Sequence, residues 1–194
     1  MAHVIEPAST GRAKCRGCGG KIAASELRFG ERLPSPFAEG ETTQWFHLDC
    51  GAYKRPEPFL EALGGREEPL EGRDRLEAEA KLGVAHPRLA RVDGAERSPS
   101  PRARCRSCRE PIAKDAWRIR LVFFEEGRFM PAGALHPRCS RAYFETTELL
   151  PRLRRFTPDV PEEDLKEIQR ELDEPSPPPV RSGLGFHPPV KGIA

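Results

Sequence analysis

Two copies of one pattern of metal-ligating residues contain every cysteine in this 194-residue chain. The first copy is Cys15-x2-Cys18 with His47-x2-Cys50, and the second, ninety residues later, is Cys105-x2-Cys108 with His136-x2-Cys139. Zn²⁺ prefers four tetrahedral sulfur or nitrogen ligands, and each copy supplies three thiols and one imidazole. The sequence therefore predicts two structural Zn²⁺ ions. The alternative is that the cysteines form disulfides or stay as buried free thiols, and the repeated spacing argues against it.

Composition indicates small modules and not one large core. Hydrophobic residues make up 37% of the chain, charged residues 32%, and there are 21 prolines. Short segments of this kind bury too little apolar surface to fold alone, so metal ions that cross-link them fit better. The sequence has no apolar run of membrane-spanning length and no apolar segment typical of a secretory signal. We expect no membrane partner and a reducing compartment: the cytoplasm, associated with the nucleoid, in a bacterium, or the nucleus in a eukaryote.

Positive charge is concentrated around the two cysteine patterns. The whole chain has a net charge of +2, whereas residues 10–55 carry +3 and residues 101–144 carry +6, which leaves −7 for the remainder. A protein that binds a polyanion needs this kind of segregation, because positive charge must lie close to the binding surface. Solvated surface charge with no binding role is the alternative interpretation.

The cysteine pattern is part of a longer internal repeat. Residues 11–28 align with residues 101–118 without a gap, and eight of the eighteen positions are identical. Zinc binding explains only the cysteines among them. The other identical positions include three pairs of arginines, Arg12 with Arg102, Arg16 with Arg106, and Arg28 with Arg118. These arginines are therefore the candidates for a shared function of the two copies.

The sequence predicts an α+β protein with two small zinc-stapled modules, each a short antiparallel sheet followed by helices, joined by a flexible linker. Strands are expected at 27–33 and 117–124, where apolar and aromatic residues precede a Pro- or Gly-containing loop. The expected organisation is a flexible N-terminus (1–9), module 1 with its helices (10–86), a linker (87–100), module 2 with its helix (101–157), a short helix (158–174) and a disordered Pro- and Gly-rich tail (175–194).

No arrangement of residues typical of an enzyme is visible in the sequence. Four protein ligands leave a zinc ion without the open position that a hydrolytic site requires. The remaining histidines, His3, His86 and His187, have no obvious carboxylate or nucleophile beside them in sequence. We therefore predict a protein that is not an enzyme and has no small-molecule substrate.

These motifs resemble the zinc fingers of poly(ADP-ribose) polymerases, which also occur in some DNA ligases and DNA 3′-phosphatases. The resemblance covers residues 10–60 and 101–150 and is carried in the first copy by GRAKCRGC, Ile22, Leu27-Arg28 and WFHLDC. The second copy departs from the pattern, with Pro101 in place of glycine, Trp117 in place of leucine, and no aromatic residue before His136.

The resemblance implies recognition of DNA strand breaks. It implies phosphate contacts for Arg12 and Arg28 in the first copy and for Arg102 and Arg118 in the second, and we add the repeated Arg16 and Arg106 as DNA-binding candidates. A guanidinium binds a phosphate bidentately and keeps its charge, which suits such a role. Fingers of this kind also place apolar side chains against the exposed base pair at a break. The base-stacking candidates are Phe37, Phe129 and Met130, with local packing as the alternative.

The function expected from the sequence is sequence-independent binding of nicks, gaps and ends in DNA through two zinc fingers. Such a protein would serve DNA repair by sensing breaks or by recruiting a repair enzyme. Two alternatives remain open, a zinc-stapled adaptor that binds an acidic protein partner and a module that binds RNA.

Overall fold

The computed structural model describes residues 2–35 and 40–175, and contains two similar modules. The first module comprises β1 (Val4–Pro7), β2 (Leu27–Pro34), β3 (Glu41–His47), α1 (Leu48–Lys54), α2 (Pro56–Gly64) and α3 (Arg73–Ala85). The second comprises the 3-10 helix η1 (Pro87–Arg91), β4 (Val92–Arg97), β5 (Trp117–Glu125), β6 (Arg128–Leu135), the 3-10 helix η2 (Pro137–Cys139), α4 (Ser140–Phe144), α5 (Leu150–Phe156) and α6 (Glu162–Asp173). The predicted disordered tail lies outside the described residues from 176 onward.

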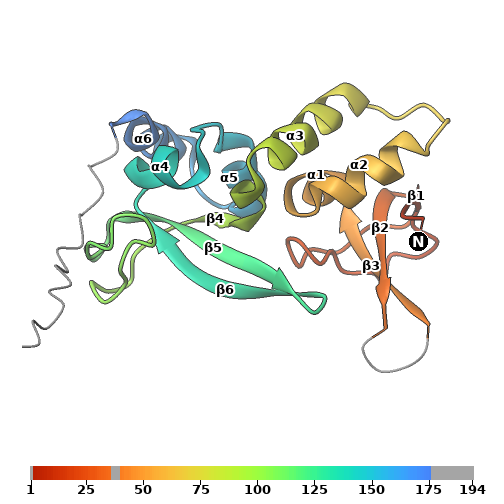
Figure 1. The fold of residues 1–194 in the computed structure, drawn as a ribbon, viewed down its shortest axis with the longest axis horizontal. Helices are drawn as coiled ribbons and strands as arrows, with labels where there is room; N and C mark the ends of the chain where they lie inside the picture. The colour runs from red at the N-terminus through yellow and green to blue at the C-terminus, as the bar shows by residue number, and fades with distance from the viewer. Residues whose placement is uncertain (1, 36–39, 176–194) are drawn as a thin grey trace, which may run out of the picture.

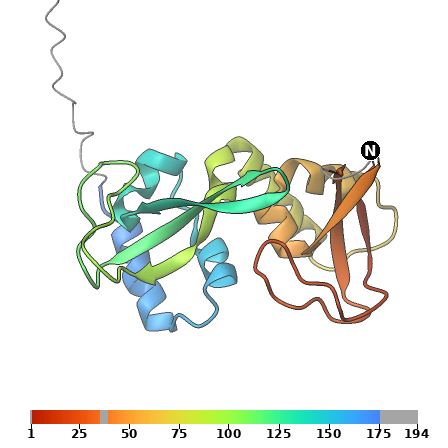
Figure 2. The same ribbon diagram turned by 90° about the horizontal axis from the view of Figure 1, so that it is seen from below.

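Each module has an antiparallel three-stranded sheet followed by helices, as the sequence predicted. The sheets have the orders β1-β2-β3 and β4-β5-β6. The predicted strands at 27–33 and 117–124 are confirmed as β2 and β5. Figures 1 and 2 show the sheets on one side of the molecule and most helices on the other. Every helix in the described part of the chain is too short or too polar to cross a lipid bilayer.

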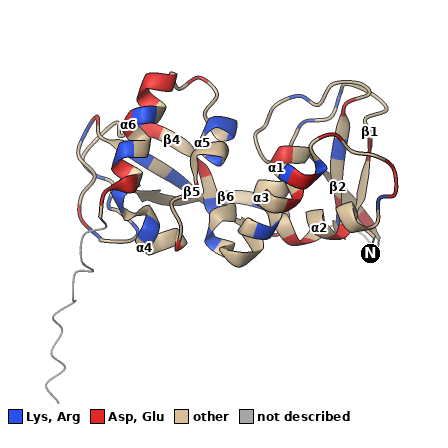
Figure 3. Ribbon diagram, turned by 90° about the horizontal axis from the view of Figure 1, so that it is seen from above, with Lys and Arg blue, Asp and Glu red and all other residues tan. Residues whose placement is uncertain are grey.

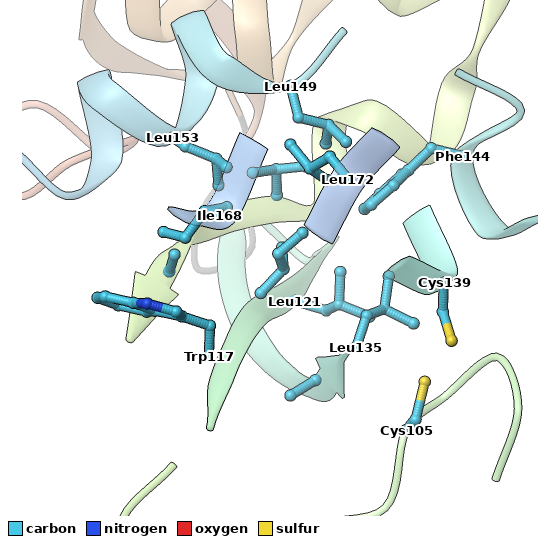
Figure 4. Packing of buried hydrophobic residues seen from close by; sticks show 14 of the residues in the cluster. Cys105, Trp117, Leu121, Leu135, Cys139, Phe144, Leu149, Leu153, Ile168 and Leu172 are labelled. Atoms are coloured by element: carbon cyan, nitrogen blue, oxygen red, sulfur yellow. The ribbon is translucent and has the colours of Figure 1, made fainter. Parts of the chain in front are cut away.

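Each module has its own hydrophobic core, and each core includes cysteines of a repeated pattern. The second core joins strand residues such as Leu121 and Leu135 to Leu153 of α5 and Ile168 of α6, with Cys139 at its edge (Figure 4). The first core is built around three phenylalanines, Phe29, Phe46 and Phe59, whose rings lie 5.4–5.8 Å apart in successive pairs. Burial of large apolar side chains beside the cysteines supplies much of the stability that such small sheets need.

The prediction of a flexible linker at residues 87–100 is wrong, because these residues form η1 and β4. β4 pairs antiparallel with β5, with Glu96 opposite Arg118. The prediction of a flexible N-terminus fails in the same way, because β1 pairs with β2 and places Glu6 opposite Arg28. Both strands are short and contain Pro, Gly or charged residues, so their own sequence has little β propensity and pairing with a longer strand orders them.

The two modules pack directly against each other. The β5–β6 hairpin extends toward the first module (Figure 1), and the backbone carbonyl of Gly127 at its turn accepts a hydrogen bond of 2.7 Å from Gln44 Nε2 of β3. Phe156 of α5 belongs to the core of the first module and lies 6.1 Å from the ring of Tyr53. The two modules therefore share an interface and are not joined only by a linker.

Candidate zinc sites and exposed arginines

The fold brings together the four predicted ligands of each site. The ligand atoms of Cys15, Cys18, His47 and Cys50 all lie within 4.8 Å of one another, and so do those of Cys105, Cys108, His136 and Cys139. His47 Nδ1 is 3.4 Å from Cys18 Sγ, and His136 Nδ1 is 3.5 Å from Cys108 Sγ. A tetrahedral zinc ion with bonds of about 2.0–2.3 Å requires edges of about 3.5–3.8 Å between its ligand atoms. Both sites are thus of the size that zinc requires.

Each histidine is oriented for metal binding by a second hydrogen bond. His47 Nε2 lies 3.2 Å from the carbonyl oxygen of Lys21, and His136 Nε2 lies 3.1 Å from that of Pro111. A carbonyl oxygen only accepts, so Nε2 carries the proton and Nδ1 keeps its lone pair for the metal. A partner that fixes the tautomer in this way is typical of zinc-bound histidines.

The three thiols of each site lie so close together that a cation between them would stabilise their ionised form. Hydrogen bonds to the neighbouring Cys15 and Cys18 sulfurs, together with burial, raise the pKa of Cys50. Burial and the adjacent charges of Cys105 and Cys108 raise the pKa of Cys139. A divalent ion removes this penalty because it binds thiolates and neutralises their repulsion. Each site offers three thiols and one imidazole at distances that fit one structural zinc ion, so the chain can hold two.

Tight turns place the first two cysteines of each site. The amide of Gly19 donates to the carbonyl of Cys15 at 2.8 Å, and the amide of Arg109 donates to that of Cys105 at 3.0 Å. Both turns end with a left-handed residue, Gly19 at φ 74° and Arg109 at φ 67°. Glycine adopts this conformation at no steric cost, whereas an arginine there is a strained choice that the zinc site must stabilise.

Four of the six predicted DNA-binding arginines are exposed beside the zinc sites. Arg12 and Arg16 flank Cys15, and Arg102 and Arg106 flank Cys105. The backbones of Arg16 and Arg106 are held against the sheets, because their amides donate at 2.9 Å to the carbonyls of Trp45 in β3 and Ala134 in β6. Each module therefore presents two guanidinium groups at equivalent positions on a loop held by the metal and by the sheet.

The other two arginines are already paired with carboxylates, which the sequence analysis did not foresee. Arg28 is 8% exposed, donates to Glu6 at 2.7 Å, and stacks 3.5 Å from the centre of the Trp45 ring. At the equivalent position in the second module, Arg118 Nε donates to Glu96 at 2.9 Å. A phosphate would have to displace or share these carboxylates, so the phosphate contacts of Arg28 and Arg118 stay a prediction.

These two ion pairs show that the internal repeat begins upstream of the residues that were aligned by sequence, 11–28 and 101–118. Glu6 and Glu96 are separated by ninety residues, as are Arg28 and Arg118. The hydrogen bonds that follow also repeat, since the amide of Ala8 donates to Glu26 and that of Ser98 donates to Ala116. An acidic residue recurring at the same offset was the available signal, although one shared residue in a short strand is easy to overlook.

The base-stacking candidates have different outcomes. Phe37 lies outside the described residues. Phe129 is not free to stack on a base, because its ring packs 6.4 Å from the ring of Phe46 in the other module. Met130 is 44% exposed and lies opposite Phe123, itself 38% exposed, in the β5–β6 ladder. Phe123 was not predicted, because alternation along β5 from Trp117 and Leu121 indicates that it faces the core.

Comparison with known proteins identifies relatives of the first module. Residues 6–86 match the family model described as the poly(ADP-ribose) polymerase and DNA-ligase Zn-finger region. These residues run from β1 to the end of α3, so they include the first zinc site and the helices that pack beside it.

Three relatives extend the similarity into the second module. They are poly [ADP-ribose] polymerase of Sarcophaga peregrina (29% identical, 62% of this chain, 14% of the relative), that of Drosophila melanogaster (30%, 64% and 14%), and poly [ADP-ribose] polymerase 1 of Gallus gallus (28%, 69% and 15%). Each aligned share of this chain is longer than the first module. The chain spans about one seventh of the length of these relatives.

Proposed function

Because residues 6–86 match the poly(ADP-ribose) polymerase and DNA-ligase zinc-finger family model, we propose that the chain binds DNA at strand breaks. The observation that carries this proposal is the repeated pair of exposed arginines at the two zinc sites, Arg12 with Arg16 and Arg102 with Arg106. Exposed guanidinium groups at equivalent places on the two ligand-bearing loops suit phosphate contacts, which position a protein on DNA without reading its sequence. Binding and not catalysis is proposed, because the family match is to a zinc-finger region.

Preference for a break needs a second kind of contact. Phosphate contacts alone do not distinguish a broken duplex from an intact one, whereas an apolar side chain can cover a base pair that has lost its stacking neighbour. Met130 and Phe123 form an exposed apolar pair on the β5–β6 hairpin. We assign this pair the role that the sequence analysis gave to Phe129 and Met130.

The docked arrangement supports binding of interrupted DNA over intact DNA. Two modules that pack against each other present both arginine pairs on one body, so the bound duplex must adapt to a fixed geometry. A nick or gap makes the duplex easier to bend, which lowers the cost of that adaptation. A role in repair by sensing breaks or recruiting an enzyme follows by analogy with the relatives. Their eukaryotic origin supports a nuclear location over the bacterial alternative.

Competition binding tests the break preference directly. We expect a nicked duplex to displace a labelled nicked probe at lower concentration than the intact duplex of the same sequence, at physiological salt. Equal competition by both would refute break recognition and leave general DNA binding. Competition by single-stranded or hairpin RNA at lower concentration than by any DNA would favour the RNA-binding alternative, and no binding to either would favour the protein adaptor.

Replacing Arg12 and Arg102 together by alanine should weaken DNA binding strongly and leave the zinc content unchanged. Each arginine is expected to contribute on the order of tenfold in affinity, since a charged hydrogen bond is worth about 1.5–3 kcal/mol. The plot of log affinity against log salt should become less steep by about 2, one for each lost phosphate contact. Fluorescence anisotropy at three salt concentrations measures both quantities.

The matched control removes an exposed positive charge outside the two zinc-binding loops. Lys166 is exposed on α6, among acidic residues. Its replacement by alanine should change neither the affinity nor the salt dependence by a measurable amount. Should the Arg12 and Arg102 double variant bind DNA as tightly as the Lys166 variant, the arginines are not the phosphate contacts.

A further inference from the structure

Helix α1 joins the first zinc site to the second module. Its N-cap residue is the ligand His47, the ligand Cys50 lies in its first turn, and Lys54 is its last residue. The side chain of Lys54 is fully buried, and its Nζ donates to the carbonyl of Val92 at 2.6 Å and to the carboxylate of Asp93 at 3.1 Å. Both acceptors belong to β4 of the second module, so one end of this short helix is at the metal and the other is at the interface.

The buried amine makes the interface sensitive to the position of α1. Burial lowers the pKa of Lys54, and the charge of Asp93 opposes that shift. The ammonium group also lies 4.4 Å from the centre of the Phe156 ring and 5.2 Å from that of Phe129, both from the second module. An ammonium group in such a setting is costly unless all of its partners stay in place. A small displacement of α1 would leave this charge buried without acceptors, or force the modules apart.

The second module also touches the first zinc site directly. Arg155 of α5 donates from Nε to Cys50 Sγ at 3.1 Å. α5 carries three arginines and no acidic residue, and it lies beside α1 in Figure 3. Zinc bound by three thiolates and a neutral histidine has a net charge of −1, so a guanidinium beside one of its thiolates is favourable. Such outer contacts adjust metal affinity, commonly by tenfold or more.

We propose that zinc at the first site holds the two modules together, with α1 as the connecting element and Arg155 as the positioning residue. Without the metal, nothing ties Cys50 to the other three ligands, so α1 loses the anchor that places both the sulfur facing Arg155 and the side chain of Lys54. Coupling between two equilibria is reciprocal, so docking of the second module must in turn stabilise zinc at the first site. The inference concerns the metal and the interface alone, and it stands whether or not the chain binds DNA.

Zinc release from Arg155→Met tests one direction of this coupling. In the 194-residue chain exposed to a chromogenic chelator, we expect the first site to lose zinc about tenfold faster than in the wild type. Alkylation of newly freed thiols followed by peptide mass mapping assigns the release to Cys15, Cys18 and Cys50, and the second site should be unaffected. The matched control is Arg154→Met, because Arg154 is an exposed neighbour on α5 that pairs with Glu162 inside its own module.

The opposite direction is tested without any change at the interface. Cys18 is an exposed ligand of the first site outside α1. Cys18→Ser, prepared with a single zinc ion at the second site as verified by native mass spectrometry, should show a larger maximum dimension by small-angle X-ray scattering than the wild type. The proposal is overturned if this protein keeps the wild-type dimension, or if Arg155→Met and Arg154→Met release zinc from the first site at the same rate.

Discussion

Cys139→Ala should prevent the second module from folding. Cys139 lies in the same buried cluster as Cys105, Cys108 and the apolar residues Ile112 and Leu135, so the metal site is part of the core (Figure 4). The apparent binding free energy of structural zinc is on the order of 10–16 kcal/mol, which matches or exceeds the roughly 5–15 kcal/mol that stabilises a typical domain. We expect the zinc content to fall from two ions to one, with loss of most of the second module's signals in an NMR spectrum.

The control for this variant is Ser107→Ala, which lies in the turn between the ligands Cys105 and Cys108 of the same zinc site. Ser107 contributes no ligand atom, and its replacement should leave two zinc ions bound and the spectrum intact. A Cys139→Ala protein that retains the native spectrum, or that still binds two zinc ions, would show that this cysteine is not a structural ligand.

Because the modules are docked, we expect Cys139→Ala to lower the thermal stability of the first module as well. The buried Lys54 receives both of its hydrogen-bond acceptors from β4, and the core of the first module includes Phe156 of α5. If the second module unfolds, an apolar ring leaves the first core and Lys54 loses its partners. The remaining thermal transition of Cys139→Ala should therefore lie below that of the wild type, whereas independent modules would keep it unchanged.

The zinc sites could be predicted from the sequence because their ligands follow local rules. A C-x2-C pair forms one turn, and a histidine three residues before a cysteine lies beside it at the start of a helix, so the spacing alone brings the ligands together. The strands β2 and β5 also carry their own signal, since apolar residues such as Leu27, Phe29, Trp117 and Ile119 alternate along them. In both cases the information lies within a few residues.

The interface could not be predicted, because its signals depend on distant parts of the chain. Lys54 and Arg152 read as solvent-exposed charges in the sequence, yet both side chains are fully buried and their partners lie in the other module. Phe123 illustrates the same limit in reverse. It follows the alternation of core residues in β5, but the register shifts between Leu121 and Val122, two successive residues that are both buried, and Phe123 beyond this shift is exposed.

The short strands β1 and β4 were missed for a related reason. Their residues have weak β propensity, and pairing with the long neighbouring strand decides their conformation. Arg28 and Arg118 were consequently assigned to phosphate alone, because the strands that supply Glu6 and Glu96 were not recognised. An arginine can recur at this position either because it contacts phosphate or because it pairs with an acidic residue of the neighbouring strand. The structure shows the second arrangement for Arg28 and Arg118.

Glu79→Gln should destabilise the whole protein by about 3–5 kcal/mol, because it leaves Arg152 buried without its countercharge. Arg152 of α5 has no exposed side-chain surface, and it donates to the carboxylate of Glu79 at 2.7 Å and to the backbone carbonyl of Glu79 at 3.0 Å. Its guanidinium also lies 4.8 Å from the centre of the Tyr53 ring. Burial is the main reason why the pKa of Tyr53 is raised to about 12. Burial persists in Glu79→Gln, so this phenol stays neutral and cannot replace the lost carboxylate.

Urea unfolding of the single and double variants separates the loss of the pair from the loss of packing. The double variant Glu79→Leu with Arg152→Met removes both charges and fills the space with apolar groups, so it should recover most of the stability that Glu79→Gln loses. The control Glu77→Gln, on the same helix, breaks only a solvent-exposed pair with Lys81 and should leave the midpoint of urea unfolding close to that of the wild type. Loss of the partner of a buried guanidinium must lower the free energy of unfolding. If Glu79→Gln lowers it no more than Glu77→Gln does, the Arg152 pair does not hold the modules together.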